Sequence, residues 1–157
     1  MIPLMDTRID LLRSLKRFYE AETRYSMSGL AVDRAALLET VHSDVVLHQP
    51  DSLPYGGQWK GREDFGRWLD AFVGTWSNIV PSDAAFHNCG GEVLVATVVM
   101  RATARTTGMH IEMPMCQVIR FSDNLPIDWR NFAWDTAILL DALRNPVPPG
   151  ISYELTG

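Results

Sequence analysis

The sequence has only two cysteines, Cys89 and Cys116, which form neither a CxxC pair nor a disulfide framework. This scarcity favours a reducing compartment, so we expect a cytoplasmic protein. Basic residues are also few, because 14 Lys and Arg against 19 Asp and Glu give a net charge of −5. That balance argues against nucleic acid or an anionic membrane surface as the main partner, since both attract basic patches.

Long apolar runs and several catalytic motifs are absent as well. No apolar run reaches the roughly 18 residues of a membrane-spanning helix, and residues 1–6 lack the basic and apolar segments of a signal peptide. The four histidines show no HxxxH or HExxH spacing, and no GxSxG, phosphate loop or dinucleotide fingerprint occurs. We therefore expect no metal site, no cofactor and no covalent serine chemistry.

The chain has 157 residues, of which 46% are hydrophobic, and this suits a single domain with a real core. We expect that core over about 6–145 and an extended, proline-rich tail at 146–157.

Apolar periodicity predicts helices in the first half of the chain. Helices are expected over 6–28, from an N-cap at Asp33 to Val41, and around the strongly periodic segment 65–76. A short strand is expected at 45–49, followed by a Pro- and Gly-rich loop at 51–61.

The second half alternates between polar and apolar residues, which predicts strands. They are expected at 78–87, 92–105, 110–121 and 127–134, and Asp135 is expected to cap a last helix. In the strand at 92–105 the even-numbered residues are apolar, and in the strand at 110–121 the odd-numbered ones are. We expect these residues to form the buried face of the sheet. The order helix–helix–strand–helix–four strands–helix predicts an α+β fold, with a curved mixed or antiparallel sheet around the N-terminal helices. Such a sheet leaves a concave interior for a small molecule.

Three polar residues fall on faces expected to be buried. Tyr25 lies on the apolar stripe of the first helix and is either a core tyrosine or a cavity group. Gln49 and Gln117 each interrupt an apolar strand face, as structural hydrogen-bonding groups or as ligand-orienting ones. Three methionines, Met100, Met113 and Met115, fit an adaptable cavity lining and a core equally well.

Asp128 and Arg130 share one face of the last strand with Phe132 and Trp134. On a concave face they form a costly buried ion pair, which makes them functional candidates. On a solvent face they are an ordinary surface pair. The two aromatic residues favour the concave face, whereas His48 opposes Gln49 in parity and is expected to point away from the interior.

Four stretches of the sequence resemble the SnoaL-like polyketide cyclase and ketosteroid isomerase superfamily. They are HSDVVLHQP at 42–50, LPYGGQWKGREDF at 53–65, MPMCQVIRF at 113–121 and IDWRNFAWDTAILLDAL at 127–143. The resemblance implies the cone-shaped α+β barrel of nuclear transport factor two, a fold that hosts several unrelated reactions.

The resemblance also implies roles for three residues. Tyr25 stands at the position of the oxyanion-hole tyrosine of the ketosteroid isomerases, Gln49 at that of their general-base aspartate, and Gln117 at that of their protonated aspartic acid. Glutamine does not shuttle protons at neutral pH, so ketosteroid isomerisation is not expected. The charged groups of limonene epoxide hydrolases would fall on Val98, Met100 and Phe132, so that chemistry is not expected either.

By this resemblance, the chain is expected to be a cofactor-free cyclase or isomerase acting on a bulky, apolar, oxygenated molecule such as a polyketide, terpenoid or steroid. Asp128 would transfer the proton, and Arg130 would either keep the Asp128 carboxylate ionised or bind a substrate oxygen. Tyr25, Gln49 and Gln117 would orient carbonyl groups. The expected apolar walls are Phe132, Trp134, Trp59 and Trp68, with Tyr55 in a loop over the mouth.

Two other functions remain open at this stage. One is a non-catalytic small-molecule-binding domain of the same fold, which the missing isomerase aspartates favour. The other is an assembly module, since the resemblance implies a homodimer formed through the sheet. Arg101, Thr103 and Arg105 would make such an interface a polar one.

Overall fold

The computed structural model describes residues 7–144, so the tail expected at 146–157 lies outside the described residues. Four helices are present: α1 (Thr7–Ser28), α2 (Ala31–Leu38), α3 (Gly61–Thr75) and α4 (Thr136–Arg144). Six strands accompany them: β1 (Val46–Gln49), β2 (Gly57–Lys60), β3 (Trp76–Gly90), β4 (Val93–Ala104), β5 (His110–Ser122) and β6 (Leu125–Ala133).

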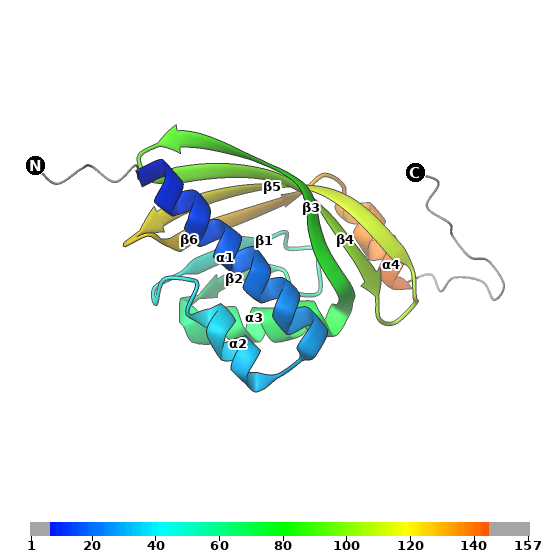
Figure 1. The fold of residues 1–157 in the computed structure, drawn as a ribbon. Helices are drawn as coiled ribbons and strands as arrows, with labels where there is room; N and C mark the ends of the chain where they lie inside the picture. Colours follow the sequence, from blue (N-terminus) through cyan, green and yellow to red (C-terminus); the bar gives the residue numbers. More distant parts are fainter. Residues whose placement is uncertain (1–6, 145–157) are drawn as a thin grey trace, which may run out of the picture.

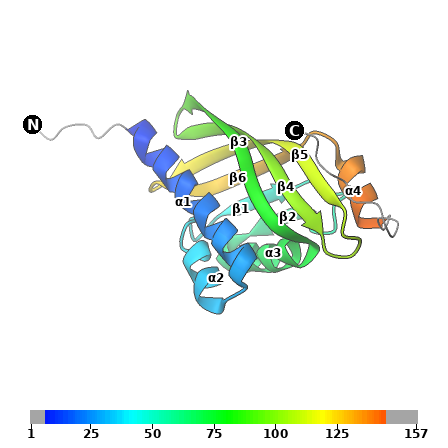
Figure 2. The same ribbon diagram turned by 45° about the vertical axis from the view of Figure 1, so that its right-hand side comes forward.

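The six strands form one mixed, open sheet in the order β2-β1-β6-β5-β4-β3. Only β1 and β6 run parallel; every other neighbouring pair is antiparallel. The long strands β3 to β6 arch over α1 and α3 (Figure 1), and the view turned by 45° shows α4 apart from the other helices (Figure 2). This is the expected cone-shaped α+β fold with one additional strand, because β2 lies inside the segment predicted as a loop.

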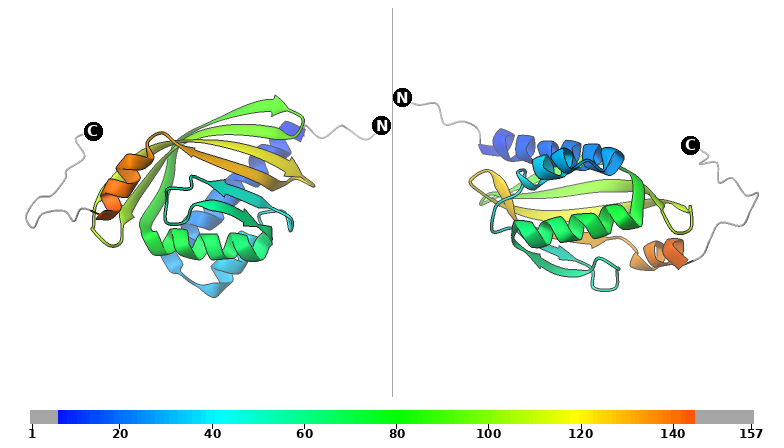
Figure 3. Two further views of the ribbon diagram at one scale, coloured as in Figure 1. Left: turned by 180° about the vertical axis from the view of Figure 1, so that it is seen from behind. Right: turned by 90° about the horizontal axis from the view of Figure 1, so that it is seen from below.

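The helices cover the concave side of the sheet and leave the convex side open (Figure 3). Leu11, Leu15 and Phe18 of the α1 stripe are almost completely buried, and Gly29 ends this helix with a left-handed φ of +63°. No helix within residues 7–144 is long and apolar enough to cross a membrane.

The helix caps confirm one expectation and correct another. The Asp135 carboxylate accepts a 2.9 Å hydrogen bond from the Ala137 N–H, so Asp135 caps α4 as predicted. Asp33 is not the N-cap of α2; that position belongs to Leu30. Asp33 lies in the first turn of α2, where its carboxylate accepts a hydrogen bond from the Ser28 hydroxyl. Its negative charge also interacts favourably with the helix dipole.

The inward faces of β4 and β5 are those predicted. In β4 the even-numbered residues from Leu94 to Ala104 are buried. In β5 the odd-numbered residues Ile111, Met113, Ile119 and Phe121 are buried, and Gln117 shares their side of the strand.

The inward face of β6 is opposite to the expected one. The turn at Asp123 and Asn124 has positive φ at both residues and pairs Phe121 with Pro126, but the next pair is Arg120 with Asp128. Ile127 is therefore an extra residue, a β-bulge, and every later side chain changes sides. A hairpin without it would have placed Asp128 opposite Ile119, on the inside.

The bulge turns all four expected cavity residues of β6 outward. Trp129 is 2% exposed, whereas Phe132 is 54% exposed and Trp134, just beyond the strand, is 83% exposed. Asp128 lies 3.4 Å from His48 Nε2 and 3.4 Å from Arg130 Nε in a partly exposed cluster. The homodimer expected through this convex face stays a prediction.

Candidate functional site

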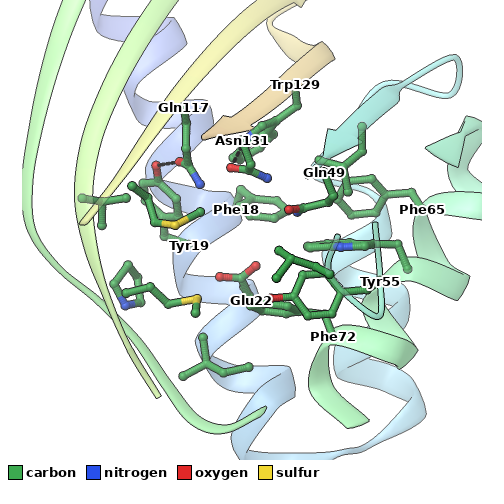
Figure 4. A pocket seen from close by; sticks show the side chains of 18 of the residues that line it. Phe18, Tyr19, Glu22, Gln49, Tyr55, Phe65, Phe72, Gln117, Trp129 and Asn131 are labelled. Carbon is green, nitrogen blue, oxygen red and sulfur yellow. Dashed lines mark hydrogen bonds between the residues drawn. The ribbon is translucent and has the colours of Figure 1, made fainter. Parts of the chain in front are cut away.

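A cavity lies between the concave face of the sheet and helices α1 and α3 (Figure 4). Its empty space amounts to about 650 Å³, a figure that includes the opening to solvent. Most of the lining is aromatic or aliphatic, including Phe18, Phe65, Trp68, Phe72, Met100 and Met115. The polar groups that line it are Tyr19, Glu22, Gln49, Tyr55, Gln117 and Asn131.

Glu22 is the one carboxyl group in this lining, and its side chain reaches from α1 into the cavity (Figure 4). The residue is 9% exposed, and no hydrogen bond or ion pair among residues 7–144 involves it. Burial raises the pKa of Glu22 from 4.5 to about 7, because the apolar surroundings penalise the ionised form. A carboxyl group of this kind both accepts and donates protons near neutral pH.

Two amides of the sheet are held by neighbouring donors. The Tyr19 hydroxyl donates to Gln117 Oε1 over 2.5 Å, and Trp129 Nε1 donates to Asn131 Oδ1 over 3.3 Å. Burial, with a smaller contribution from Glu22, raises the pKa of Tyr19 far above its usual value, so the hydroxyl keeps its proton. Each amide is thereby oriented through its oxygen.

Tyr55 lies between β1 and β2 and lines the cavity, and it is fixed from two sides. Its hydroxyl accepts a 3.0 Å hydrogen bond from Trp76 Nε1, and its backbone oxygen accepts one of 3.1 Å from Trp59 Nε1. Burial raises the pKa of Tyr55 to about 12, so its hydroxyl remains a donor. Trp59 supports this segment through that hydrogen bond. It was predicted to be a wall of the cavity, but it does not line it.

Trp68 differs from the other buried tryptophans. Its indole Nε1 is buried without an acceptor among residues 7–144, whereas the indoles of Trp76 and Trp129 each donate a hydrogen bond. The Trp68 ring instead packs between Phe65 and Phe72, with ring centroids 5.1 Å away on each side. Trp68 therefore acts in the cavity wall through its apolar surface.

Replacing tryptophan by phenylalanine tests this difference. Trp68→Phe loses no hydrogen bond, whereas Trp76→Phe loses the bond to Tyr55. We expect Trp76→Phe to lower the free energy of unfolding by about 1–2 kcal/mol more than Trp68→Phe. Urea denaturation of both variants measures the difference, and equal losses would show that the Trp68 indole N–H has a partner in solution.

Tyr25, expected in the cavity, lies outside its lining. Its hydroxyl donates to Asp70 Oδ1 over 3.2 Å, and Arg34 holds the same carboxylate with two hydrogen bonds of 2.8 and 2.9 Å. The Arg34 guanidinium holds the pKa of Asp70 below its usual value. Tyr25 therefore helps to connect α1, α2 and α3, and the α1 tyrosine that lines the cavity is Tyr19.

The other expected residues divide into three groups. Six line the cavity, and their roles toward a substrate stay predictions: Gln49, Gln117, Tyr55, Trp68, Met100 and Met115. Met113 is buried in the core, outside the lining. Asp128, Arg130, Phe132 and Trp134 lie on the convex side because of the bulge at Ile127, so they do not meet the cavity.

Sequence reasoning missed Tyr19, Glu22, Trp129 and Asn131. Glu22 was detectable, because it follows Phe18 by four residues and Leu15 by seven, on the buried stripe of α1. Asn131 and Trp129 face the cavity because of the bulge at Ile127, and a hydrophobic pattern alone does not locate a bulge.

The described residues form a small α+β domain whose sheet and helices surround a largely apolar cavity. The model of the SnoaL-like domain family matches residues 15–127. The chain therefore belongs to the SnoaL-like family, as the sequence stretches indicated. Among curated proteins, none matches the chain.

Solved structures share the fold at low sequence identity. An NTF2-like protein of unknown function from Burkholderia pseudomallei has a TM-score of 0.74 at 21% identity, covering 87% of this chain and 98% of that one. A proposed polyketide cyclase from Xanthomonas campestris has a TM-score of 0.70 at 19% identity, with 87% and 98% covered. TerC, co-crystallised with polyporic acid, has a TM-score of 0.74 at 14% identity, with 87% and 99% covered. These similarities establish the NTF2-like fold.

Proposed function

We propose that the chain is a cofactor-free acid–base enzyme of the cyclase or isomerase type, in which Glu22 moves a proton on a bulky, apolar, oxygenated substrate. One observation carries this proposal: a buried carboxyl group with no partner among the described residues faces a largely apolar cavity. Burying such a group is unfavourable for folding, so its presence favours a functional role.

The proposed step is removal of a proton from a carbon next to a substrate carbonyl group. The Glu22 carboxylate accepts the proton, and the electron pair of the C–H bond moves to the carbonyl oxygen to form an enolate. The side-chain amides of Gln49, Asn131 and Gln117 are the nearby donors that suit this negative oxygen. Protonated Glu22 then returns the proton at another carbon. In the cyclase case the enolate carbon instead attacks a second carbonyl group of the same molecule to close a ring, and the alkoxide that forms takes the proton from Glu22.

The ionisation of Glu22 supports both halves of this step. With a pKa of about 7, the carboxylate and the carboxylic acid coexist near neutral pH. A general acid–base group works best when its pKa lies near the working pH. Asp128, expected to be the catalytic carboxylate, is outside the cavity and has no place in this mechanism.

The names of the structural neighbours are compatible with the proposal. One is a proposed polyketide cyclase, and TerC was crystallised with polyporic acid. The alternative is a binding domain of the same fold that leaves its ligand unchanged, and the experiment must separate the two.

Deuterium exchange separates them without knowledge of the natural substrate. The probe is 2-tetralone, an apolar bicyclic ketone with acidic C–H bonds beside its carbonyl group. We expect the protein in D₂O at about pH 7 to accelerate exchange at these carbons, followed by proton NMR. Glu22→Gln should lower the accelerated rate by about 10²-fold or more, the usual range for a general base.

Asp128→Asn is the matched control, because it neutralises a carboxylate of the same domain on the convex side. It should exchange the ketone at the wild-type rate. Binding of 2-tetralone without accelerated exchange would favour the binding domain. Full activity in Glu22→Gln would remove Glu22 from the mechanism.

A further inference from the structure

A series of aromatic rings lines the same cavity as Glu22. The centroids of consecutive rings lie 5.1–6.1 Å apart, in stacked, tilted or edge-to-face contact. We call these six residues the aromatic row: Tyr19, Phe18, Phe65, Trp68, Phe72 and Tyr55. Figure 4 shows members of this row and the Glu22 carboxyl group around the same space. The faces of aromatic rings carry partial negative charge, so they attract cations.

The cavity offers a place for a negative charge and none for a positive one. Glu22 is its one carboxyl group, and no lysine, arginine or histidine among residues 7–144 belongs to the lining. Glu22 also forms no ion pair with any described residue. A buried carboxylate normally has a cationic partner, because it loses its hydration on folding. The described part of the chain therefore lacks the counter-ion that this carboxylate favours.

The remaining titratable groups of the lining do not supply that counter-ion. They are Tyr19 of α1 and Tyr55, between β1 and β2. Burial raises the pKa of both hydroxyl groups, so both stay neutral. The strands β1, β3, β4, β5 and β6 and the helices α3 and α4 contribute only uncharged side chains to the lining. A cation that pairs with Glu22 therefore has to come from a ligand.

The acceptors of the cavity limit which cation fits. The side-chain oxygens of Gln117 and Asn131 already accept hydrogen bonds within the protein. A primary ammonium group brings three N–H donors, and each buried donor without a partner weakens binding. A tertiary or quaternary ammonium group brings one donor or none, and its alkyl groups suit apolar walls. An alkylated ammonium group is therefore the cation that this lining favours.

We propose that the cavity is a receptor for an alkylated ammonium ligand, with the Glu22 carboxylate as counter-ion and the aromatic row around the alkyl groups. Folding has already removed water from this carboxylate, so the ligand alone loses its hydration on binding. Aromatic faces replace much of the hydration of a quaternary ammonium group. The inference goes beyond the proposed function, because a bound cation occupies Glu22 and blocks the proposed proton transfer.

The test compares two probes of the same shape. Choline carries a quaternary ammonium group, and 3,3-dimethyl-1-butanol has a neutral carbon in place of the nitrogen. At about pH 8 and constant ionic strength, we expect choline to bind about tenfold more tightly or better, measured by proton NMR titration. The choline methyl resonance should also move upfield on binding, because aromatic rings shield protons that lie over their faces.

Glu22→Gln removes the charge and keeps the size of the side chain, so it should abolish the preference for choline. Unchanged binding of the neutral alcohol by this variant shows that the cavity is intact. Glu20→Gln is the matched control, because Glu20 lies on the same helix, is exposed and lies outside the lining. The control should keep the preference, since salt and water screen an exposed charge.

The pH dependence of binding gives a second readout in the unaltered protein. Choline keeps its charge at every pH, so a change in affinity reports on the protein. Because Glu22 has a pKa of about 7, the fraction of carboxylate falls about 30-fold from about pH 8 to about pH 5.5. Choline should bind about 30-fold more weakly at the lower pH, whereas the neutral alcohol should not weaken.

Equal binding of the two probes, no binding of choline, or a preference that survives in Glu22→Gln or at low pH would overturn the proposal. These results are independent of the proposed enzyme, since no measurement here requires turnover. Failure with choline alongside Glu22-dependent deuterium exchange would refute the cation site alone. Recognition of choline without accelerated exchange would refute the enzyme and keep the receptor.

Discussion

Glu22→Gln should make the protein more stable at neutral and alkaline pH. Glu22 has a pKa of about 7 in the folded state against 4.5 as its ordinary value, because burial disfavours the charge. Above pH 7 the folded protein carries this buried carboxylate, whereas glutamine is neutral at every pH. A shift of this size corresponds to about 3 kcal/mol of unfolding free energy.

The sign of this pH dependence follows from how many protons the folded and the unfolded states bind. Between pH 4.5 and about 7 the folded state keeps the proton on Glu22 while the unfolded state has lost it. The free energy of unfolding therefore falls as the pH rises through this window, and it is independent of this group below and above it. This is the reverse of a salt-bridged carboxylate such as Asp70, whose pKa is lowered.

Denaturant titrations of the wild type and Glu22→Gln at several pH values measure the effect. The difference in stability between the two proteins should grow by about 3 kcal/mol from about pH 4 to about pH 8, while other titrating groups cancel. A constant difference would mean that the carboxylate has a favourable partner in solution, and the proposed general base would then lose its physical basis.

The fold was predictable because its main signals are local. The stripe of Leu11, Leu15 and Phe18 specifies α1, and the alternation in β4 and β5 specifies which side of each strand is buried. The short strand β2 was missed, since Gly57 to Lys60 lies among glycines and prolines that indicate a loop. It forms because β1 offers an antiparallel partner, from Val46 opposite Lys60 to Gln49 opposite Gly57.

The candidate site was predictable only in part, because half of it depends on register. Gln49 and Gln117 were found, since each interrupts an apolar face on a strand whose inward side was clear. Asp128 and Arg130 were assigned to the wrong side, because the inserted residue at Ile127 reverses parity after the turn. A bulge depends on pairing between strands, and the sequence of one strand does not contain that information.

Glu22 was missed in the sequence for a different reason. Its place on the α1 stripe was available from spacing alone, but charged residues on neighbouring positions, Glu20 and Arg24, are exposed and make the helix look like an ordinary amphipathic one. The informative observation is a charge in the buried stripe, not the number of charges on the helix. A charged residue in that stripe is therefore a stronger functional candidate than the nearby Tyr25.

Trp129 and Trp134 provide the sharpest test of the corrected face of the last strand. Trp129 is 2% exposed and packs against Phe18 with ring centroids 4.5 Å apart, whereas Trp134 is 83% exposed. Trp129→Ala should lower the free energy of unfolding by about 3–5 kcal/mol, the usual cost of removing a large buried aromatic side chain. Trp134→Ala should change it by less than about 0.5 kcal/mol, as for other surface substitutions.

Urea denaturation of both variants at low protein concentration measures the two losses. The comparison is controlled within itself, because the same side chain is removed from two positions five residues apart in the sequence. The sequence-based assignment, with Asp128, Arg130 and Trp134 inside, requires the opposite ranking. A larger loss for Trp134→Ala would therefore restore that assignment and return Asp128 to the cavity as the candidate base. The expected ranking instead fixes Trp129 and Asn131 as inward residues that line the cavity.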